Sequence, residues 1–149
     1  MELRELVVIE IEVRPVVDLG GGRRFVPFDG GTFEGRGRLS ATAGAVLAGG
    51  VDWQTVRPDG VLEIDAHYAL ASDAGETIEL RSRGIRKAEE SVSARIANGE
   101  SVDPGEYYFR THVRLSTPAP RLRWLNDLLA VSAGERTRDR VRIDVHEVL

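Results

Sequence analysis

Two segments of the sequence carry polar side chains at every second position, the spacing that places them on one face of a β-strand. Asp65 and His67 form one such pair, and Tyr108, Arg110 and His112 form a longer set. A carboxylate, an imidazole, a phenol and a guanidinium could together move a proton on an anionic or carbonyl-bearing molecule. We therefore predict that these two strand faces line a small-molecule site.

Four further residues complete the predicted site. Asp52 follows a double glycine, Trp53 comes next, and Trp124 and Asn126 share a third strand face. The tryptophans would shape the cavity, and Arg110 would hold an anionic group. The predicted catalytic residues are Asp52, Asp65, His67, Tyr108 and Arg110, and the predicted ligand-binding residues are Trp53, His112, Trp124 and Asn126.

Each assignment has a structural alternative. Antiparallel sheets commonly have one solvated face, so Asp65 and His67 could simply face water. Arg110 could form a structural ion pair with a nearby aspartate. The tryptophans could belong to the core, and Asn126 could bond to buried backbone.

Metal and cofactor motifs are missing from the sequence. His67, His112 and His146 fall on three different expected strands, but there is neither a His-x-His pair nor a His-Glu-x-x-His motif. The absence of cysteine excludes disulfides, thiolate metal sites and cysteine nucleophiles. No Gly-x-Ser-x-Gly segment is present, and the double glycine is not followed by Gly-Lys-Ser/Thr. We expect neither a metal nor a cofactor.

The elements that position these residues are predicted by alternating apolar and polar positions. One short helix is expected over residues 88–98, because Ala88, Val92 and Ile96 share a face and Asn98-Gly99 supplies a stop. Eight to ten short strands with one helix are typical of an antiparallel sandwich or barrel. The principal expected strands cover residues 3–13, 33–41, 51–56, 61–70, 76–83, 106–116, 122–132 and 141–149.

Composition sets outer limits on the protein. A length of 149 residues, of which 42% are hydrophobic, fits one domain with a real core over residues 1–149. The net charge of −4 disfavours nucleic acid and anionic membranes as partners. The first 13 residues carry five charges and no apolar segment, and the longest uncharged run, 39–51, is too short to span a bilayer. We expect a cytoplasmic protein.

Five short motifs, in this order and spacing, resemble the domain-of-unknown-function 3237 family, also called uncharacterised protein family 0311. They are GGTFEG at 30–35, GGVDW at 49–53, RPDG at 57–60, YYFRT at 107–111 and WLN at 124–126. The resemblance covers nearly the whole chain. It implies an all-β fold, a closed antiparallel lipocalin-like (calycin-like) barrel, and a homo-oligomer, but it brings no established catalytic residues.

Three functions remain open at this point. The first is a cofactor-free cyclase, isomerase or lyase that uses acid–base groups in the barrel cavity. The second is a small-ligand carrier or sensor, which needs no proton-transfer group. The third is an oligomeric interaction module, which a solidly filled barrel would favour. The density of ionisable groups on the expected strands favours the enzyme.

Overall fold

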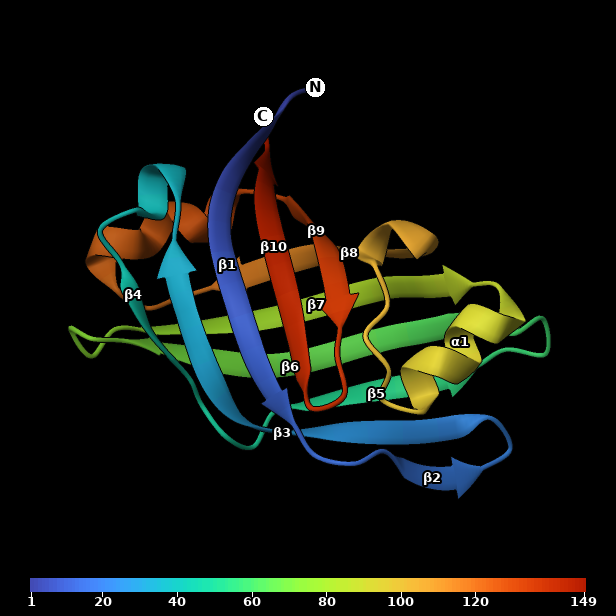
Figure 1. Ribbon diagram of the computed structural model, residues 1–149. Helices are drawn as coiled ribbons and strands as arrows, with labels where there is room; N and C mark the ends of the chain where they lie inside the picture. Colours follow the sequence, from blue (N-terminus) through green and yellow to red (C-terminus); the bar gives the residue numbers. More distant parts are fainter.

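The computed structural model describes residues 1–149 and contains a single sheet of ten antiparallel strands (Figure 1). Its helical elements are α1 (Glu90–Ala97) and the 3-10 segments η1 (Gly37–Leu39), η2 (Pro104–Glu106) and η3 (Pro120–Asp127). The strands are β1 (Leu3–Val13), β2 (Val17–Gly20), β3 (Arg23–Gly35), β4 (Ala43–Val46), β5 (Val51–Val56), β6 (Leu62–Ser72), β7 (Thr77–Ala88), β8 (Tyr107–Ser116), β9 (Ala130–Arg136) and β10 (Arg140–Val148).

The sheet closes into a barrel. Its strand order is β1-β10-β9-β8-β7-β6-β4-β3, and β1 pairs with β3 to close the ring. β5 lies between β3 and β6 beside β4, and β2 extends the sheet from β3. The result is an eight-stranded closed barrel with two extra strands, which confirms the predicted fold class.

The closure depends on a sharp bend in β3. Its second half pairs with β1 and β4, while its first half turns away to pair with β2 and β5. Gly30 and Gly31 lie at the bend with φ of +137° and +141°, and a Cβ on Gly31 would lie 2.0 Å from the Glu10 carbonyl oxygen. Glycines at such positions allow a sharp bend inside a continuous strand.

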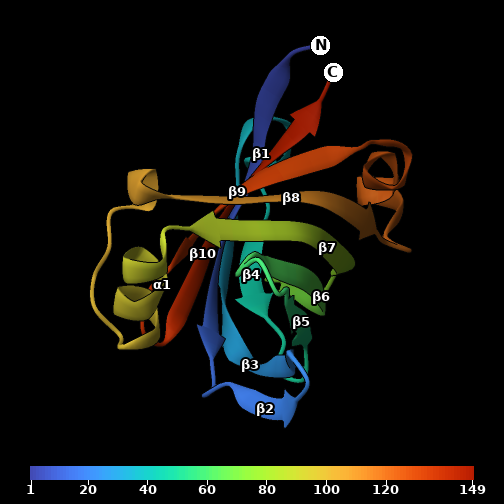
Figure 2. The same ribbon diagram turned by 90° about the vertical axis from the view of Figure 1, so that its right-hand side faces the viewer.

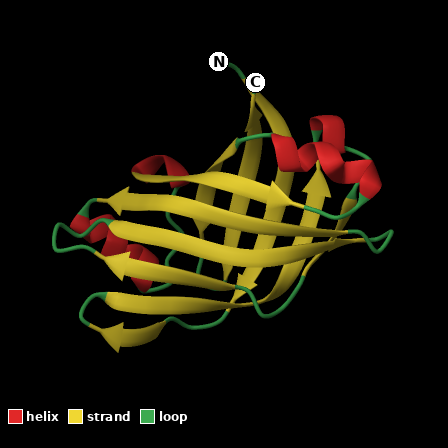
Figure 3. Ribbon diagram, turned by 180° about the vertical axis from the view of Figure 1, so that it is seen from behind, coloured by secondary structure: helices red, strands yellow, loops and turns green.

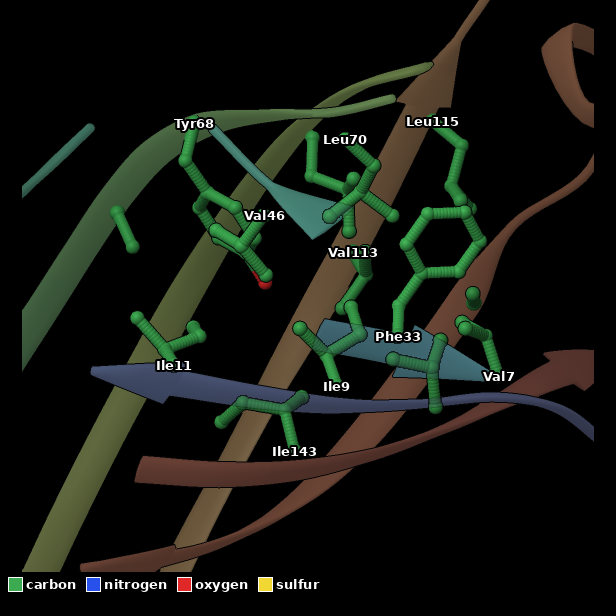
Figure 4. Close-up of a cluster of buried hydrophobic side chains, with 14 of the residues drawn as sticks. Val7, Ile9, Ile11, Phe33, Val46, Tyr68, Leu70, Val113, Leu115 and Ile143 are labelled. Carbon is green, nitrogen blue, oxygen red and sulfur yellow. The ribbon is translucent and has the colours of Figure 1, made fainter. Parts of the chain in front are cut away.

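Apolar side chains from all sides of the barrel fill most of its interior (Figure 4). Val7, Ile9 and Ile11 of β1 point inward at every second position, as the sequence predicts for this strand. Across the interior they face residues such as Leu70 and Val113, so the core is continuous from wall to wall. The barrel is therefore packed over most of its length.

One end of the barrel is plugged by η3, whose Leu122 and Leu125 are fully buried. The sequence predicts a strand over residues 122–132, and this prediction is wrong for its first half. Pro118 and Pro120 cannot donate backbone hydrogen bonds to a sheet, so the chain coils into η3 and re-enters the sheet only at Ala130.

The opposite end carries α1, so helical segments lie at both ends of the barrel (Figures 2 and 3). The predicted helix is confirmed, with slightly narrower bounds. Its apolar face is buried through Val92 and Ile96, which leaves its polar face exposed. None of the helices has the length and apolar character needed to cross a membrane.

Candidate functional site

The interior of the barrel is not completely filled toward the end that carries α1. A cavity of about 40 Å³ remains among side chains from most walls of the barrel. Because one water occupies about 10–15 Å³ by this measure, the space holds roughly three waters or a few non-hydrogen atoms. Its polar lining consists of Asp52, Gln54, Ser82, Arg86, Thr111 and Arg136, and its apolar lining includes Phe28, Ile64, Phe109 and Ile143.

A wider, partly open mouth of about 920 Å³ lies between this cavity and the solvent. Ser93, Ala94 and Ala97 of α1 form part of its wall. Gln54, Arg86 and Arg136 line both the mouth and the deep cavity. These shared residues define the neck through which a molecule would pass from the mouth to the deep cavity.

Asp52 projects into the deep cavity from β5. It is opposite Val26 of β3 and Ala66 of β6, and all three are buried. Its carboxylate accepts hydrogen bonds from Gln54 Nε2 at 2.7 Å and from the Asp65 backbone N–H at 3.1 Å. Burial nevertheless raises the pKa of Asp52 to about 6, because the low-dielectric interior disfavours the charged form more than these bonds favour it.

A short relay of hydrogen bonds ties Asp52 to the neck. Arg24 Nε donates to Gln54 Oε1 at 2.7 Å, and the amide of Gln54 donates in turn to Asp52. The alternation that places Asp52 inside also places Gln54 inside, two residues further along β5. The relay fixes the orientation of the carboxylate within the cavity.

The neck and mouth are rich in arginine. Burial, together with the nearby charges of Arg24 and Arg136, lowers the pKa of Arg86 to about 10. Burial also lowers the pKa of Arg24 and of Arg136, although Asp52 opposes both shifts. The charged residues of the mouth are the five arginines Arg14, Arg24, Arg86, Arg136 and Arg138 and the two acids Glu90 and Asp139.

Neutral hydroxyl groups complete the interior. Tyr68 lines the cavity from β6, and burial, followed by the charge of Asp52, raises the pKa of its phenol. Tyr68 therefore stays protonated and able to donate a hydrogen bond. On the adjoining strands β7, β8 and β9, Ser82, Thr111 and Ser132 form a chain of hydroxyls with O···O distances of 2.6 Å.

The predicted cavity-facing placement of Asp65 and His67 is wrong. Both side chains point to the outside of the barrel, because Ile64, Ala66 and Tyr68 occupy the inward positions of β6. Asp65 forms ion pairs with Arg81 and Arg83, and His67 Nε2 lies 2.5 Å from Glu79 Oε2.

The β8 residues are also on the outside. Tyr107, Phe109 and Thr111 are buried, so Tyr108, Arg110 and His112 alternate with them toward solvent. Arg110 lies 5.4 Å above the ring of Tyr108 and donates to the Phe109 carbonyl.

The remaining ligand-binding candidates lie away from the cavity as well. Trp53 is 42% exposed and packs against Phe25 on the outer face. Trp124 lies at the plugged end under Arg38, at 4.0 Å from guanidinium carbon to ring centre. Asn126 bonds to both the N–H and the carbonyl of Thr117. Of the nine predicted site residues, only Asp52 lines the cavity.

Sequence reasoning missed Arg24, Gln54, Tyr68, Arg86 and Arg136. Gln54 could have been found, because it shares a face with Asp52. Arg86 follows Ser82 and Gly84 at a spacing of two, which is a weak signal. In no place does the structure gather three His, Asp or Glu side chains closely enough to hold a metal ion.

Comparison with known proteins places this barrel among uncharacterised relatives. A family model described as "Protein of unknown function (DUF3237)" matches residues 1–148. A UPF0311 protein of Rhodopseudomonas palustris is 36% identical over all of this chain and 97% of its own length. A UPF0311 protein of Clostridium acetobutylicum is 33% identical over 99% of this chain and 94% of its own length.

Solved structures show the same architecture. The crystal structure of the conserved R. palustris protein superposes with a TM-score of 0.93 at 36% identity, over 99% of this chain and 97% of that one. A β-barrel-like protein of Acinetobacter baumannii gives 0.82 at 34% identity, over 98% and 94%. An enzyme from Penicillium herquei gives 0.67 at 18% identity, over 97% and 93%, and shares the fold. The chain belongs to the DUF3237 family, also known as UPF0311.

Proposed function

We propose that this barrel is a cofactor-free enzyme of the isomerase, lyase or cyclase kind, in which Asp52 moves a proton on a small carbonyl-bearing molecule. The observation that supports this most directly is a buried carboxyl group, with its pKa raised to about 6, on the wall of a cavity that connects to the surface. A base with such a pKa is largely ionised at neutral pH and still basic enough to accept a proton from carbon. The P. herquei neighbour is compatible with catalysis in this fold.

The chemistry would begin with proton abstraction. The Asp52 carboxylate takes a proton from the carbon next to the carbonyl group and becomes a carboxylic acid, while the electron pair of the C–H bond forms an enolate. The neutral phenol of Tyr68 donates a hydrogen bond to the enolate oxygen. Return of the proton to another atom completes an isomerisation. Departure of a leaving group from the neighbouring carbon completes an elimination. Attack of the enolate carbon on a second carbonyl carbon of the same molecule closes a ring, and the oxygen of that carbonyl then takes the proton back from Asp52.

The second candidate is a ligand carrier or sensor. The arginine-rich mouth favours it, because guanidinium groups bind an anion whether or not a proton is moved. The two functions differ in their need for Asp52. A carrier needs Asp52 only as a wall of the cavity, and an enzyme needs its basicity.

Hydrogen–deuterium exchange at carbon separates the two. The probes are 2-oxobutanoate, levulinate and the neutral ketone 2-pentanone, each followed by proton NMR in D₂O. We expect the wild-type protein to accelerate exchange of the protons beside the carbonyl, and Asp52→Asn to lower that rate at least about 100-fold, as for loss of a general base.

Glu63→Gln is the matched control, since it removes an exposed carboxylate from the outer face of β6, the strand paired with that of Asp52. It should leave the exchange rate unchanged. Equal exchange rates for wild-type and Asp52→Asn protein would rule out the enzyme. Binding of a probe without any exchange would support the carrier instead.

A further inference from the structure

Arg86 and Arg136 mark the neck between the mouth and the deep cavity. Arg86 extends inward from β7, two residues after Gly84, and Arg136 ends β9 on the neighbouring part of the wall. They are the two positively charged residues that line both spaces. A molecule in the deep cavity therefore has these two guanidinium groups at its outer end.

The arginines at the neck have no direct ion-pair partner in the protein. Asp52 is the one acidic residue of the deep cavity, and its oxygens already accept bonds from Gln54 and from a backbone N–H. Asp52 acts on Arg24, Arg86 and Arg136 only as a nearby charge, as do Asp18 on Arg24 and Asp139 on Arg136, and all three arginines are partly desolvated. Guanidiniums that crowd together without matching carboxylates form a ready anion site.

The space beyond the neck sets the shape of the ligand. The deep cavity is bounded mainly by apolar side chains, among them Phe28, Ile64 and Phe109, and its volume of about 40 Å³ admits only a few atoms. A second charged group would not be solvated there. The part of the ligand that reaches Asp52 must therefore be short and largely apolar.

We infer that the ligand is a small amphipathic anion, with a carboxylate or phosphate group held between Arg86 and Arg136 and a short carbon chain or small ring beside Asp52. The assignment of the end beside Asp52 rests on the proposed function. The assignment of the anionic end depends only on the two arginines of the neck. It also gives the ligand one orientation, because reversal would place the anion among apolar side chains.

Calorimetric titration tests the assignment. The probes are butanoate, butyl phosphate and the neutral butanamide, which has nearly the shape of butanoate. We expect one or both anions to bind at millimolar concentration and the amide to bind at least about tenfold more weakly. Tighter binding of butyl phosphate would indicate a phosphate as the natural anionic group, and tighter binding of butanoate would indicate a carboxylate.

Variants locate the anion. Arg86→Gln and Arg136→Gln should each weaken binding of the preferred anion at least about tenfold. Arg110→Gln, which removes an arginine from the outer surface, is the control and should bind like the wild type. The midpoint of thermal unfolding should stay the same or rise in Arg86→Gln, because the variant relieves repulsion among like charges.

Four results would overturn the inference. Three concern binding: the amide binds as tightly as both anions, both neck variants leave anion binding unchanged, or neither anion binds. The fourth is loss of binding in Arg86→Gln together with a large fall in the unfolding midpoint, since that result indicates a structural arginine. These outcomes would not contradict the proposed enzyme if exchange of carbon-bound protons still depended on Asp52. Anion binding without such exchange would contradict the proposed enzyme and still support the anion site.

Discussion

Asp52 is buried where a carboxylate is costly, and the cost depends on pH. Its ordinary pKa of 3.8 is raised to about 6 by burial in the folded protein. Between these two pH values the folded state binds more protons than the unfolded state. The free energy of unfolding should therefore fall as the pH rises from about 4 to about 6.

Substitution makes this contribution measurable. Asp52→Asn removes the titrating group, so the stability of the wild type relative to this variant should drop by about 2–3 kcal/mol between pH 4 and pH 7. Urea denaturation at a series of pH values gives both curves. Asp127→Asn, an exposed position, controls for the loss of one negative charge. A constant difference between wild type and Asp52→Asn across this range would contradict the raised pKa.

At the scale of the strands, the sequence predicted most positions well and several faces poorly. The strand expected over 33–41 is wrong beyond residue 35, because β3 runs from Arg23 to Gly35 and the chain then forms η1. The ranges of β1, β5, β6 and β8 and the helix followed from alternation and stop signals. On β6 and β8, however, the polar face was assigned to the interior because a ligand site needs polar groups. Apolar side chains fill most of the interior of a small barrel, so the apolar face of each of these strands points inward.

The lining of the cavity and its neck could not be predicted from any one strand. Arg24, Asp52, Arg86 and Arg136 come from four strands, and only the register of the closed barrel brings them together. Arg24 and Arg86 interrupt inner faces that carry apolar residues elsewhere on their strands, whereas Asp52 and Arg136 share their inner faces with Gln54 and Ser132. A charged residue on an otherwise apolar face is thus a better signal for a barrel site than a regular polar face.

Close approach of β7 and β8 depends on Gly84, which occupies an inward position between Ser82 and Arg86. A Cβ at this residue would lie 2.0 Å from the Arg110 carbonyl oxygen. Because that oxygen belongs to the backbone of β8, the clash could be relieved only by moving one strand away from the other. We expect Gly84→Ala to lower the free energy of unfolding by about 2–4 kcal/mol, as measured by urea denaturation.

Gly105→Ala is the matched control for this strand prediction. The nearest atom to its added Cβ would be a side-chain oxygen of Asp103 at 3.2 Å, in an exposed turn. It should change stability far less than Gly84→Ala. Equal effects of the two substitutions would mean that β7 can shift away from β8 without loss.

Considered as a whole, the barrel has one closed end and one end at which the arginine-rich mouth opens. At the closed end, η3 fills the opening, and the buried Glu147 lies 3.3 Å from Arg4 and 3.6 Å from Arg38. Arg121 binds Glu76 at 2.6 Å on the same side. The Arg121–Glu76 pair ties η3 to the turn between β6 and β7, and the arginine-rich mouth opens at the other end of the barrel, beside α1.

The outer face next to the mouth carries an apolar row. Val17, Phe25 and Trp53 are aligned by the pairing of β2, β3 and β5, and Val17 and Trp53 are 39% and 42% exposed. The free edge of β2 lies beside this row. Exposed apolar rows and open strand edges are features that assembly commonly covers.

We expect the homo-oligomer predicted for this chain to use the row formed by Val17, Phe25 and Trp53. Because a symmetric dimer presents the same patch twice, a charge placed in the row is doubled at the interface. Val17→Lys and Trp53→Lys should each reduce the mass measured by light scattering to that of one chain. Tyr108→Lys, at another exposed aromatic, should leave the assembly intact. A wild-type mass of one chain, or equal effects of all three substitutions, would show that this face does not form the interface.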